Sequence, residues 1–592
     1  MAGGGMVAVG AEHLHAEAYG GRLTGYVIFV AILSACGGLL FGYDIGVTGG
    51  VTAMAGFQQK FFPDVYERTV LGISDTSPYC KYDNQVLQTF TSTMFLAGMF
   101  SSFFAGTMCR KLGRKATMFT SACLFILGAG LQAGAQNLAM LFVGRAFLGF
   151  GIGFANTVVP LYLSEVAPFN FRGGLNMLFQ LFTTIGILIA GLVNYGVQDW
   201  WAGWRLSLGL AAAFALGLLV GSIVLPESPN SLIERGQVEK GRAVLERLRG
   251  TKDVEAEMED ILEATELASL VSLRQSYTML LTKAYRPQLI LSCLIPFFQQ
   301  FTGINAIMFY VPVIFNSLGS GRRASLLNTI IINCINSAST MVAVLLVDKF
   351  GRRFFLLEAG VQMFITQTIV GVVLATQFGK YDDGKLPTGT TVGVLVVICV
   401  YIASSAWSWG PMGWLVPSEI HTLETRPAGM SIAVAANFLF SFVIGQSFLS
   451  MLCAMKWGVF LFFAGWVVVM TLFAYFLIPE TKGVPVERVP IMFARHALWS
   501  RVMGPVSLEI IERDATRTIS RQAAADQRAA ANGDLKKAAL CNHHENPTQS
   551  LCSPQVSVPW TDQHFPMASH QNILNPTRAS LSPDVSRLAR LG

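Results

Sequence analysis

Two charged residues of opposite sign, Asp44 and Arg145, lie in stretches of sequence that are otherwise almost free of charge, FGYDIGVTGG (41–50) and MLFVGRAFLGFGIGF (140–154). An aspartate at the centre of a bilayer costs about 2.5–3.5 kcal/mol on insertion scales, and charges inside membranes usually pair or face water. We therefore expect an ion pair in which the carboxylate carries a proton and the arginine controls its affinity. Two alternatives stay open: Asp44 caps a helix at an interface, or Arg145 extends to one.

Three amides form a second group, in the apolar segment LIPFFQQFTGINAIMFYVPVIF (294–315). On a straight helix, Asn305 would point about 140° away from Gln300. Three residues that break or loosen helices stand in the same segment: Pro296, Gly303 and Pro312. A discontinuous helix can turn Gln299, Gln300 and Asn305 toward one cavity, where amides suit the hydroxyls of a neutral polyol. The alternative is that these amides join neighbouring helices.

Further polar or aromatic residues stand alone in apolar segments: Gln180, Asn336, Asn437 and Trp414. Taken singly, each of these residues is explained equally well by helix packing and by a place in a binding cavity. Together they describe a cavity lined by amides and aromatic rings, in which Trp414 can stack on the apolar face of a sugar ring.

The composition indicates whether these residues belong to a soluble protein or to a membrane protein. The 592 residues are 52% hydrophobic and 13% charged, whereas soluble proteins carry about 25% charge. The net charge of +6 needs no nucleic acid as a partner, because basic loops orient a membrane protein. We identify no nucleophile–base pair, phosphate-binding loop or metal-ligand cluster, and CNHHENPTQSLC (541–552) fits no common zinc spacing. The sequence thus predicts a membrane protein that is not an enzyme and needs no metal or cofactor.

About twenty apolar residues are needed to span a bilayer. Twelve segments qualify: 24–45, 86–108, 116–134, 138–160, 173–197, 205–225, 287–316, 325–347, 354–376, 390–416, 427–450 and 457–478. Two loops are basic, with Arg110, Lys111, Arg114 and Lys115 in one and Lys349, Arg352 and Arg353 in the other. The excess of positive charge places both loops in the cytosol. With an even number of spans, both termini are then cytosolic.

The sequence repeats itself. LGRK (112–115) returns as FGRR (350–353), SEVAPFNFRG (164–173) as SEIHTLETRPAG (418–429), and PESP (226–229) as PETK (479–482). Two six-helix halves of this kind indicate a transporter with its substrate near the midplane. We divide the chain into a cytosolic segment 1–22, a first half 23–225 with an extracellular loop at about 50–85, a cytosolic helical loop 226–286, a second half 287–478, and a cytosolic tail 479–592, mostly disordered after about 500.

Eight motifs, including FGYDIGVTGGV, GRAFLGFGIGF, QQFTGINAIMFY, GPMGWLVPSEI and PETKG, occur in this order. With them the chain resembles the sugar porters of the major facilitator superfamily, above all the plant sugar transport proteins, which are proton-coupled hexose symporters. The resemblance spans residues 25 to about 485. It implies an all-α fold of twelve transmembrane helices in two pseudo-symmetric halves, the major facilitator fold, with a long cytosolic loop between them.

The resemblance also implies roles for single residues. The proton carboxylate matches Asp44 and its partner Arg145. The sugar-binding residues match Phe41, Ile45, Gln180, Gln299, Gln300, Asn305, Asn336, Trp414 and Asn437. The inner gate matches Arg114, Glu165, Arg172, Arg352, Glu419 and Arg426. One departure is Arg110, which stands where the superfamily has an acid.

Two cysteines, Cys80 and Cys453, fall in loops that the orientation places outside, where disulfides persist. The resemblance agrees, because these porters have an extracellular lid tied to the opposite half. We expect a Cys80–Cys453 disulfide.

These features predict a proton-coupled hexose symporter that imports one sugar with one proton by alternating access. The alternatives are a facilitative uniporter, which Asp44 argues against, and a transporter-like sugar sensor, which only the long tail supports. The partners are then a monosaccharide, a proton and the lipid bilayer, and we expect a monomer. The resemblance implies the plasma membrane, with the vacuolar membrane as the alternative.

Overall fold

The structure, a computed structural model, describes residues 23–71, 80–168, 171–269, 272–317, 321–377, 387–422, 424–484 and 488–512. This part of the chain forms helices and no strand. Eleven of its helical segments are long and apolar enough to span a membrane. A twelfth span consists of two shorter helices joined end to end. The protein therefore has the all-α, twelve-span architecture that the hydropathy pattern predicts.

The first six spans are α2 (Gly25–Thr52), α5 (Gln85–Leu112), α6 (Arg114–Ala133), α7 (Leu138–Val166), α8 (Arg172–Val197) and α9 (Gly203–Val224). The last six are α14 (Arg286–Phe301) with α15 (Ile304–Ser317), α16 (Arg322–Phe350), α17 (Arg352–Gln377), α18 (Thr388–Trp407) with α19 (Trp409–Glu419), α20 (Arg426–Met455) and α21 (Gly458–Leu477). Each predicted span coincides with one of these.

Polar caps explain where several helices start. The side chain of Asn84 accepts hydrogen bonds from the backbone N–H groups of Val86 and Leu87, and Asn137 accepts one from Met140. These amides satisfy donors that a helix leaves unpaired at its first turn. They fix the starts of α5 and α7, and the second of these helices carries Arg145.

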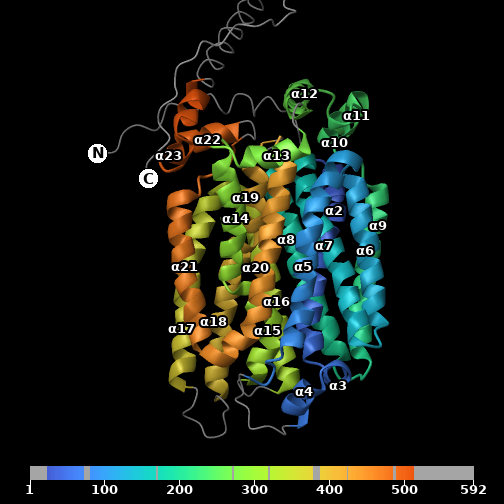
Figure 1. The fold of residues 1–592 in the computed structure, drawn as a ribbon, viewed down its shortest axis with the longest axis vertical. Helices are drawn as coiled ribbons and strands as arrows, with labels where there is room; N and C mark the ends of the chain where they lie inside the picture. Colours follow the sequence, from blue (N-terminus) through green and yellow to red (C-terminus); the bar gives the residue numbers. More distant parts are fainter. Residues whose placement is uncertain are drawn as a thin grey trace, which may run out of the picture. The chain divides into compact units, whose positions relative to one another are not determined.

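The two halves of the bundle meet along two seams (Figure 1). One seam is formed by α5 and α20, and the other by α8 and α16. The helices α2 and α15 also contact each other between the seams. The centre of the molecule is thus enclosed by helices from both halves.

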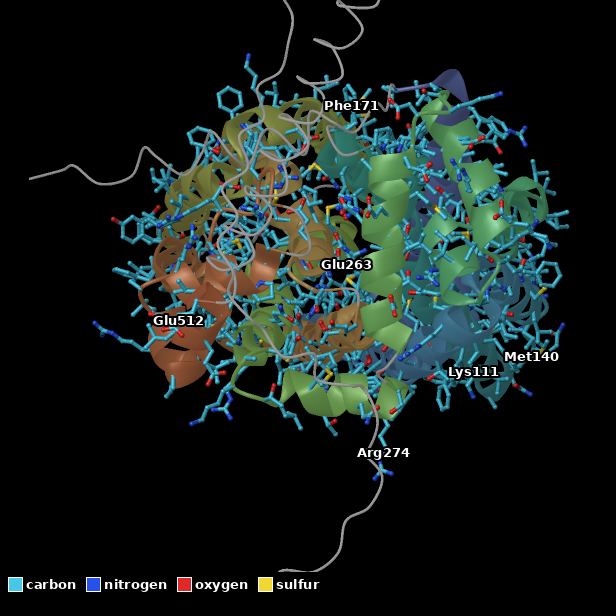
Figure 2. All side chains as sticks on the ribbon, turned by 90° about the horizontal axis from the view of Figure 1, so that it is seen from above. Lys111, Met140, Phe171, Glu263, Arg274 and Glu512 are labelled. Carbon is cyan, nitrogen blue, oxygen red and sulfur yellow. A yellow bond between two sulfur atoms is a disulfide. The ribbon has the colours of Figure 1, made fainter. Side chains whose placement is uncertain are left out.

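Short helices cover the two ends of the bundle (Figure 1). Helices α10 (Pro229–Glu234), α11 (Val238–Arg249), α12 (Glu255–Ser269) and α13 (Leu273–Leu280) lie at one end, and α3 (Ala55–Phe61) and α4 (Pro63–Tyr66), continued by the π-helical turn η1 (Glu67–Leu71), lie at the other. Figure 2 views the molecule from the α10–α13 end, where Glu263 of α12 and Arg274 of α13 lie toward the viewer. We call these the loop end and the lid end.

Two features differ from the expectation or extend it. The tenth span is not one helix but two, because the chain leaves helical geometry at Ser408 (φ −127°, ψ −96°). After the last span, α22 (Val489–Arg495), α23 (Trp499–Met503) and a helix over 505–512 follow. Helical structure therefore continues past residue 500, up to Glu512. The terminal segments 1–22 and 513–592 lie outside the described residues.

Candidate sugar and proton site

The seventh span is interrupted between α14 and α15. Gly303 has a φ of +83°, a conformation that glycine adopts without strain. The carbonyl of Thr302 beside the break accepts hydrogen bonds from Gln367 Nε2 and from the Tyr401 hydroxyl, both at 2.7 Å. A buried carbonyl at membrane depth needs such partners. The sequence predicted this break, and buried polar side chains from two other helices stabilise it.

The second break, at Ser408, is hydrogen-bonded to α14, the helix that ends at the first break. Gln299 of α14 donates to the carbonyls of Trp409 at 3.1 Å and Gly410 at 2.7 Å. It also accepts a hydrogen bond of 2.6 Å from Asn437 Nδ2 of α20. One glutamine therefore connects three spans of the second half, through the first two carbonyls of α19 and the side-chain amide of Asn437.

A cavity lies between the halves at the level of these breaks. It is lined by Phe41, Ile45, Gln180, Thr183, Ile187, Gln299, Gln300, Ile304, Asn305, Met308, Asn336, Ser405, Ala406, Gly410, Trp414 and Asn437. All nine residues that the sequence analysis assigns to sugar binding are among them. The structure therefore brings together side chains from α2, α8, α14, α15, α16, α19 and α20. Helix packing alone would not require all of these polar side chains to face the same space.

Seven of the lining residues are not among those expected from the sequence. Four are aliphatic or small and carry no distinguishing pattern: Ile187, Ile304, Ala406 and Gly410. Met308 is equally inconspicuous in an apolar segment. Thr183 and Ser405 are hydroxyl residues, which are common in membrane helices because they bond to their own backbone, as Thr183 does to the carbonyl of Phe179.

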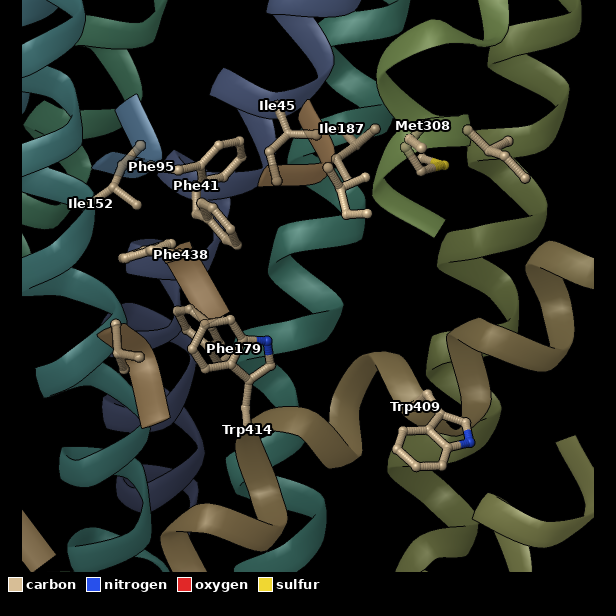
Figure 3. Close-up of a cluster of buried hydrophobic side chains, with 14 of the residues drawn as sticks. Phe41, Ile45, Phe95, Ile152, Phe179, Ile187, Met308, Trp409, Trp414 and Phe438 are labelled. Carbon is tan, nitrogen blue, oxygen red and sulfur yellow. The ribbon is translucent and has the colours of Figure 1, made fainter. Parts of the chain in front are cut away.

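Amides and aromatic rings divide the cavity wall between them. Asn305 Nδ2 donates to Gln300 Oε1 at 2.6 Å, so the two amides that a straight helix would separate do meet. The rings of Phe41 and Trp414 pack edge to face with centroids 6.2 Å apart, and Phe179 contacts Trp414 in the same way. Figure 3 shows Phe41 beside Phe438, with Trp414 and Phe179 on the other side of the same cluster. Such a wall offers hydrogen bonds and an apolar surface together, which is what a sugar ring presents.

Asp44 and Arg145 form the expected ion pair. Arg145 Nη1 lies 2.8 Å from Asp44 Oδ1 and 3.0 Å from Oδ2. The side chains are 1% and 0% exposed, so the two alternatives at an interface are wrong in this structure. Asp44 stands on α2 between Phe41 and Ile45, which both line the cavity.

Residues around the pair were not predicted. Arg145 Nη2 donates to the Thr48 hydroxyl at 2.5 Å, and Thr48 donates in turn to the Asp44 carbonyl at 2.6 Å. The guanidinium carbon lies 4.3 Å from the centroid of the Phe90 ring. Thr48 stands one turn beyond Asp44, a spacing that could have revealed it. Phe90 is one of 42 phenylalanines, and no sequence pattern separates it from the rest.

The predicted gate residues form two matching networks at the loop end. In the first half, Arg114 pairs with Glu165 at 2.7 Å, and Ser228 donates to the same carboxylate at 2.5 Å. In the second half, Arg352 pairs with Glu419 at 2.6 Å, and Thr481 donates to it at 2.6 Å. The internal repeat of the sequence therefore appears as a repeat of contacts.

The PES and PET motifs complete these networks. The carboxylate of Glu227 accepts from the backbone N–H of Arg114 at 2.8 Å, and Glu480 accepts from that of Arg352 at 2.9 Å. Gly113 precedes the first arginine with a φ of +96°, and a Cβ there would lie 2.4 Å from the Glu227 carboxylate. Glycine is thus required for the carboxylate to cap the helix.

The remaining predicted gate residues also lie at this end. Arg172 donates through Nε to the Ser164 carbonyl at 2.9 Å, and Arg426 is 2% exposed. Asp348 takes the place in the second half that Arg110 takes in the first. It contacts Arg352 at 3.1 Å and accepts from Gly174 N–H of the first half at 2.8 Å. The two halves are therefore in direct contact at the loop end.

At the lid end, Cys80 and Cys453 form the expected disulfide, with their Cα atoms 4.7 Å apart. Polar side chains beside it add to this link, because Ser450 of α20 donates to Asp83 Oδ1 just before α5 at 2.8 Å and Ser92 of α5 donates to Gln446 of α20 at 2.7 Å. The α5–α20 seam is thus fastened covalently and by hydrogen bonds at this end.

Comparisons with known proteins agree with this geometry. The chain is 61% identical over 87% of its length to H(+)/hexose cotransporter 2 of Parachlorella kessleri, covering 96% of that protein. It is 51% identical to Sugar transport protein 7 of Arabidopsis thaliana, over 85% of this chain and 97% of that one. Its fold matches the proton:xylose symporter XylE, a member of the major facilitator superfamily, with a TM-score of 0.69 and 25% identity over 81% of this chain and 100% of that one. A family model described as "Sugar (and other) transporter" matches residues 30–493. The chain therefore belongs to the family of sugar and other transporters and has the major facilitator fold.

Proposed function

We propose that the protein is a proton-coupled hexose symporter that imports one sugar with one proton. The observation that carries this proposal is the buried Asp44–Arg145 pair on a helix whose neighbouring residues, Phe41 and Ile45, line the amide-rich cavity. Two relatives named as H(+)/hexose cotransporters support the same substrates.

The loop end is the cytosolic end in this proposal. The basic residues of LGRK (112–115) and FGRR (350–353) lie there, and an excess of positive charge is typical of cytosolic loops. The lid end, with the disulfide, is then extracellular. We place the protein in the plasma membrane, with both termini in the cytosol, and we propose that it works as a monomer.

Coupling follows from the geometry of the pair. A protonated Asp44 no longer attracts Arg145 as an anion, so the helices α2 and α7 can separate. Phe41 and Ile45 move with α2, and a sugar held between the halves favours the arrangement in which they close on it. Loss of the proton toward the cytosol restores the ion pair and resets the carrier.

The gate networks control the release of sugar to the cytosol in this proposal. Arg114–Glu165 joins α6 to α7, and Arg352–Glu419 joins α17 to α19, at the loop end. These networks, with the contact between Asp348 and Gly174, must open before sugar reaches the cytosol. The two halves are in contact at that end, which fits a state that precedes release.

The driving force is sufficient for accumulation. One proton that crosses a potential of about 100 mV gains about 2.3 kcal/mol, and one pH unit adds about 1.4 kcal/mol. With one proton for each sugar, the sum supports a concentration ratio of several hundredfold.

The test is uptake of labelled hexose by transporter-deficient cells that express the chain. A symporter accumulates sugar above the external concentration at acidic pH, and a protonophore abolishes the accumulation. Equilibration without accumulation identifies a uniporter. Saturable binding without uptake, in protein that reaches the membrane, identifies a sensor.

A further inference from the structure

One carboxylate lies on the outer surface of the bundle, away from the cavity and the gate. Glu358 is the single charged residue of α17 after Arg353, and it is exposed. Phe354, Val361 and Ile365 lie on the same stripe of the helix and are 53%, 57% and 50% exposed. Such an apolar stripe on a peripheral span faces lipid. Glu358 therefore interrupts a lipid-facing surface.

The length of α17 indicates the depth of this carboxylate. A helix of 26 residues is about 39 Å long, while the hydrocarbon core is about 30 Å thick. If α17 is centred, each end extends about 4–5 Å beyond the core. Glu358 stands six residues, or about 9 Å, from the start of α17. It thus lies about one turn inside the hydrocarbon edge, within reach of the headgroups on the loop side.

The contacts of Glu358 leave its charge uncompensated within the protein. The indole Nε1 of Trp407, at the end of α18, donates to Glu358 Oε2 at 3.0 Å. In the described ranges, no lysine, arginine or histidine lies within ion-pair distance of this carboxylate. Ionisable side chains in spanning helices are costly and normally face the bundle interior or a partner. A cation from outside the protein would compensate the charge.

We propose that Glu358 and Trp407 form a binding site for the primary ammonium of phosphatidylethanolamine in the leaflet at the loop end. The carboxylate accepts hydrogen bonds from N–H donors, which an ethanolamine ammonium has and a choline headgroup lacks. The indole N–H holds one carboxylate oxygen in place and leaves the other to accept from the ammonium. Anionic lipids are excluded by the sign of the charge.

Native mass spectrometry of the purified full-length protein tests this site. The protein is mixed with equal amounts of phosphatidylethanolamine, phosphatidylcholine and phosphatidylglycerol that share the same acyl chains, and the retained lipids are counted. The unmodified protein should retain phosphatidylethanolamine about fivefold over phosphatidylcholine, the factor given by one modest ion pair. Equal retention of these two lipids by the unmodified protein would overturn the proposal.

Three variants test whether Glu358 causes the preference for phosphatidylethanolamine. Glu358→Gln keeps the acceptor for Trp407 but loses the charge, and should abolish the preference. Glu358→Lys should shift retention toward phosphatidylglycerol. The matched control is Glu259→Gln, which makes the same chemical change on the exposed surface of α12 and should change nothing.

Two further outcomes would contradict the proposal. If Glu358→Gln retains lipids as the unmodified protein does, the carboxylate is not the site. If the same spectra show instead that this variant dissociates a dimer, the carboxylate contacts a second copy and the proposal is wrong. The readout is lipid retention, so the result is independent of whether the protein couples sugar to protons.

Discussion

The hydroxyl of Thr48 lies 2.5 Å from Nη2 of Arg145, and the Asp44 carboxylate lies 2.8 Å from Nη1 of the same guanidinium. Thr48 thus holds the arginine through one nitrogen while Asp44 holds it through the other. The position of the positive charge is therefore set by two residues of the same helix, one turn apart.

Thr48→Val tests this arrangement, because valine has the same shape and no hydroxyl. A buried donor left without its partner costs about 1–3 kcal/mol. We expect slower uptake and a shift of the pH of half-maximal uptake toward alkaline values, since the charge that opposes protonation is held less firmly. Thr48→Ser should retain the profile of the unmodified protein. An unchanged profile in the valine variant would show that Thr48 only fills space.

Asp44→Asn keeps the shape of the side chain but cannot ionise. We expect it to abolish accumulation and the pH dependence of uptake, while exchange of labelled for unlabelled sugar across the membrane continues. Asp64→Asn, on the exposed surface of α4, makes the same change away from the pair and should leave accumulation intact. Accumulation by the Asp44 variant that a protonophore still collapses would place the proton site elsewhere.

Asn437→Ala removes the amide that donates to Gln299 at 2.6 Å and one polar group from the cavity. We expect KM for hexose to rise about tenfold, since a lost hydrogen bond of this kind contributes about 1–1.5 kcal/mol. Asn194→Ala is the control, because Asn194 is a buried amide that donates to the Gly46 carbonyl at 3.2 Å and does not line the cavity. If both variants raise KM equally, the effect of Asn437 is on stability and not on the sugar.

His421 lies between α19 and α20, outside the spans, and is 0% exposed. Burial, with Arg426 nearby, lowers the pKa of His421 to about 3. Below its ordinary pKa of about 6.5 the unfolded chain binds a proton that the folded protein does not, so stability falls as the pH decreases from 6.5 toward 3. At pH 5 this loss is about 2 kcal/mol.

His421→Asn removes this titration and retains a partner for Ser292, whose hydroxyl lies 2.7 Å from Nε2 of the ring. The melting temperature of the purified variant should therefore fall less between pH 7.5 and pH 5 than that of the unmodified protein. His496→Asn, at a half-buried position, should have a smaller effect. Equal pH dependence in the His421 variant and the unmodified protein would exclude His421 as the cause.

The helical segment after the last span predicts where the chain can be shortened. Trp499 and Met503 are buried, and the Trp499 indole donates to the Leu477 carbonyl at 2.7 Å. A chain that ends after residue 512 should transport as the full chain does. A chain that ends after residue 497 loses both contacts and should express poorly and melt at a lower temperature. Trp499→Ala should reproduce this defect, since large-to-small changes at buried tryptophans cost about 3–5 kcal/mol. Full stability of the shorter chain would show that these contacts contribute little.

The sequence by itself determined the spans and the partner of Asp44. Spans could be predicted because bilayer thickness imposes a length on each apolar segment. The pairing of Asp44 with Arg145 could be predicted because an isolated charge is costly there and each of the two segments holds a single charge. The break in the seventh span could be predicted from Gly303, since glycine and proline mark interruptions by their own backbone geometry.

Only the tertiary structure decided which backbone groups and neighbours complete the site. Pro411 lies just beyond the break at Ser408 and has no N–H for the carbonyl of Trp407, so the sequence could have indicated the break itself. It could not indicate that Gln299 of another span donates to the carbonyls beyond the break. The roles of Thr48, Phe90 and Glu358 depend on partners that are about fifty to a hundred residues away in the sequence. A periodic pattern reports which face of a helix a residue occupies, but not which helix packs against that face. That choice is made by the packing of all twelve spans at once.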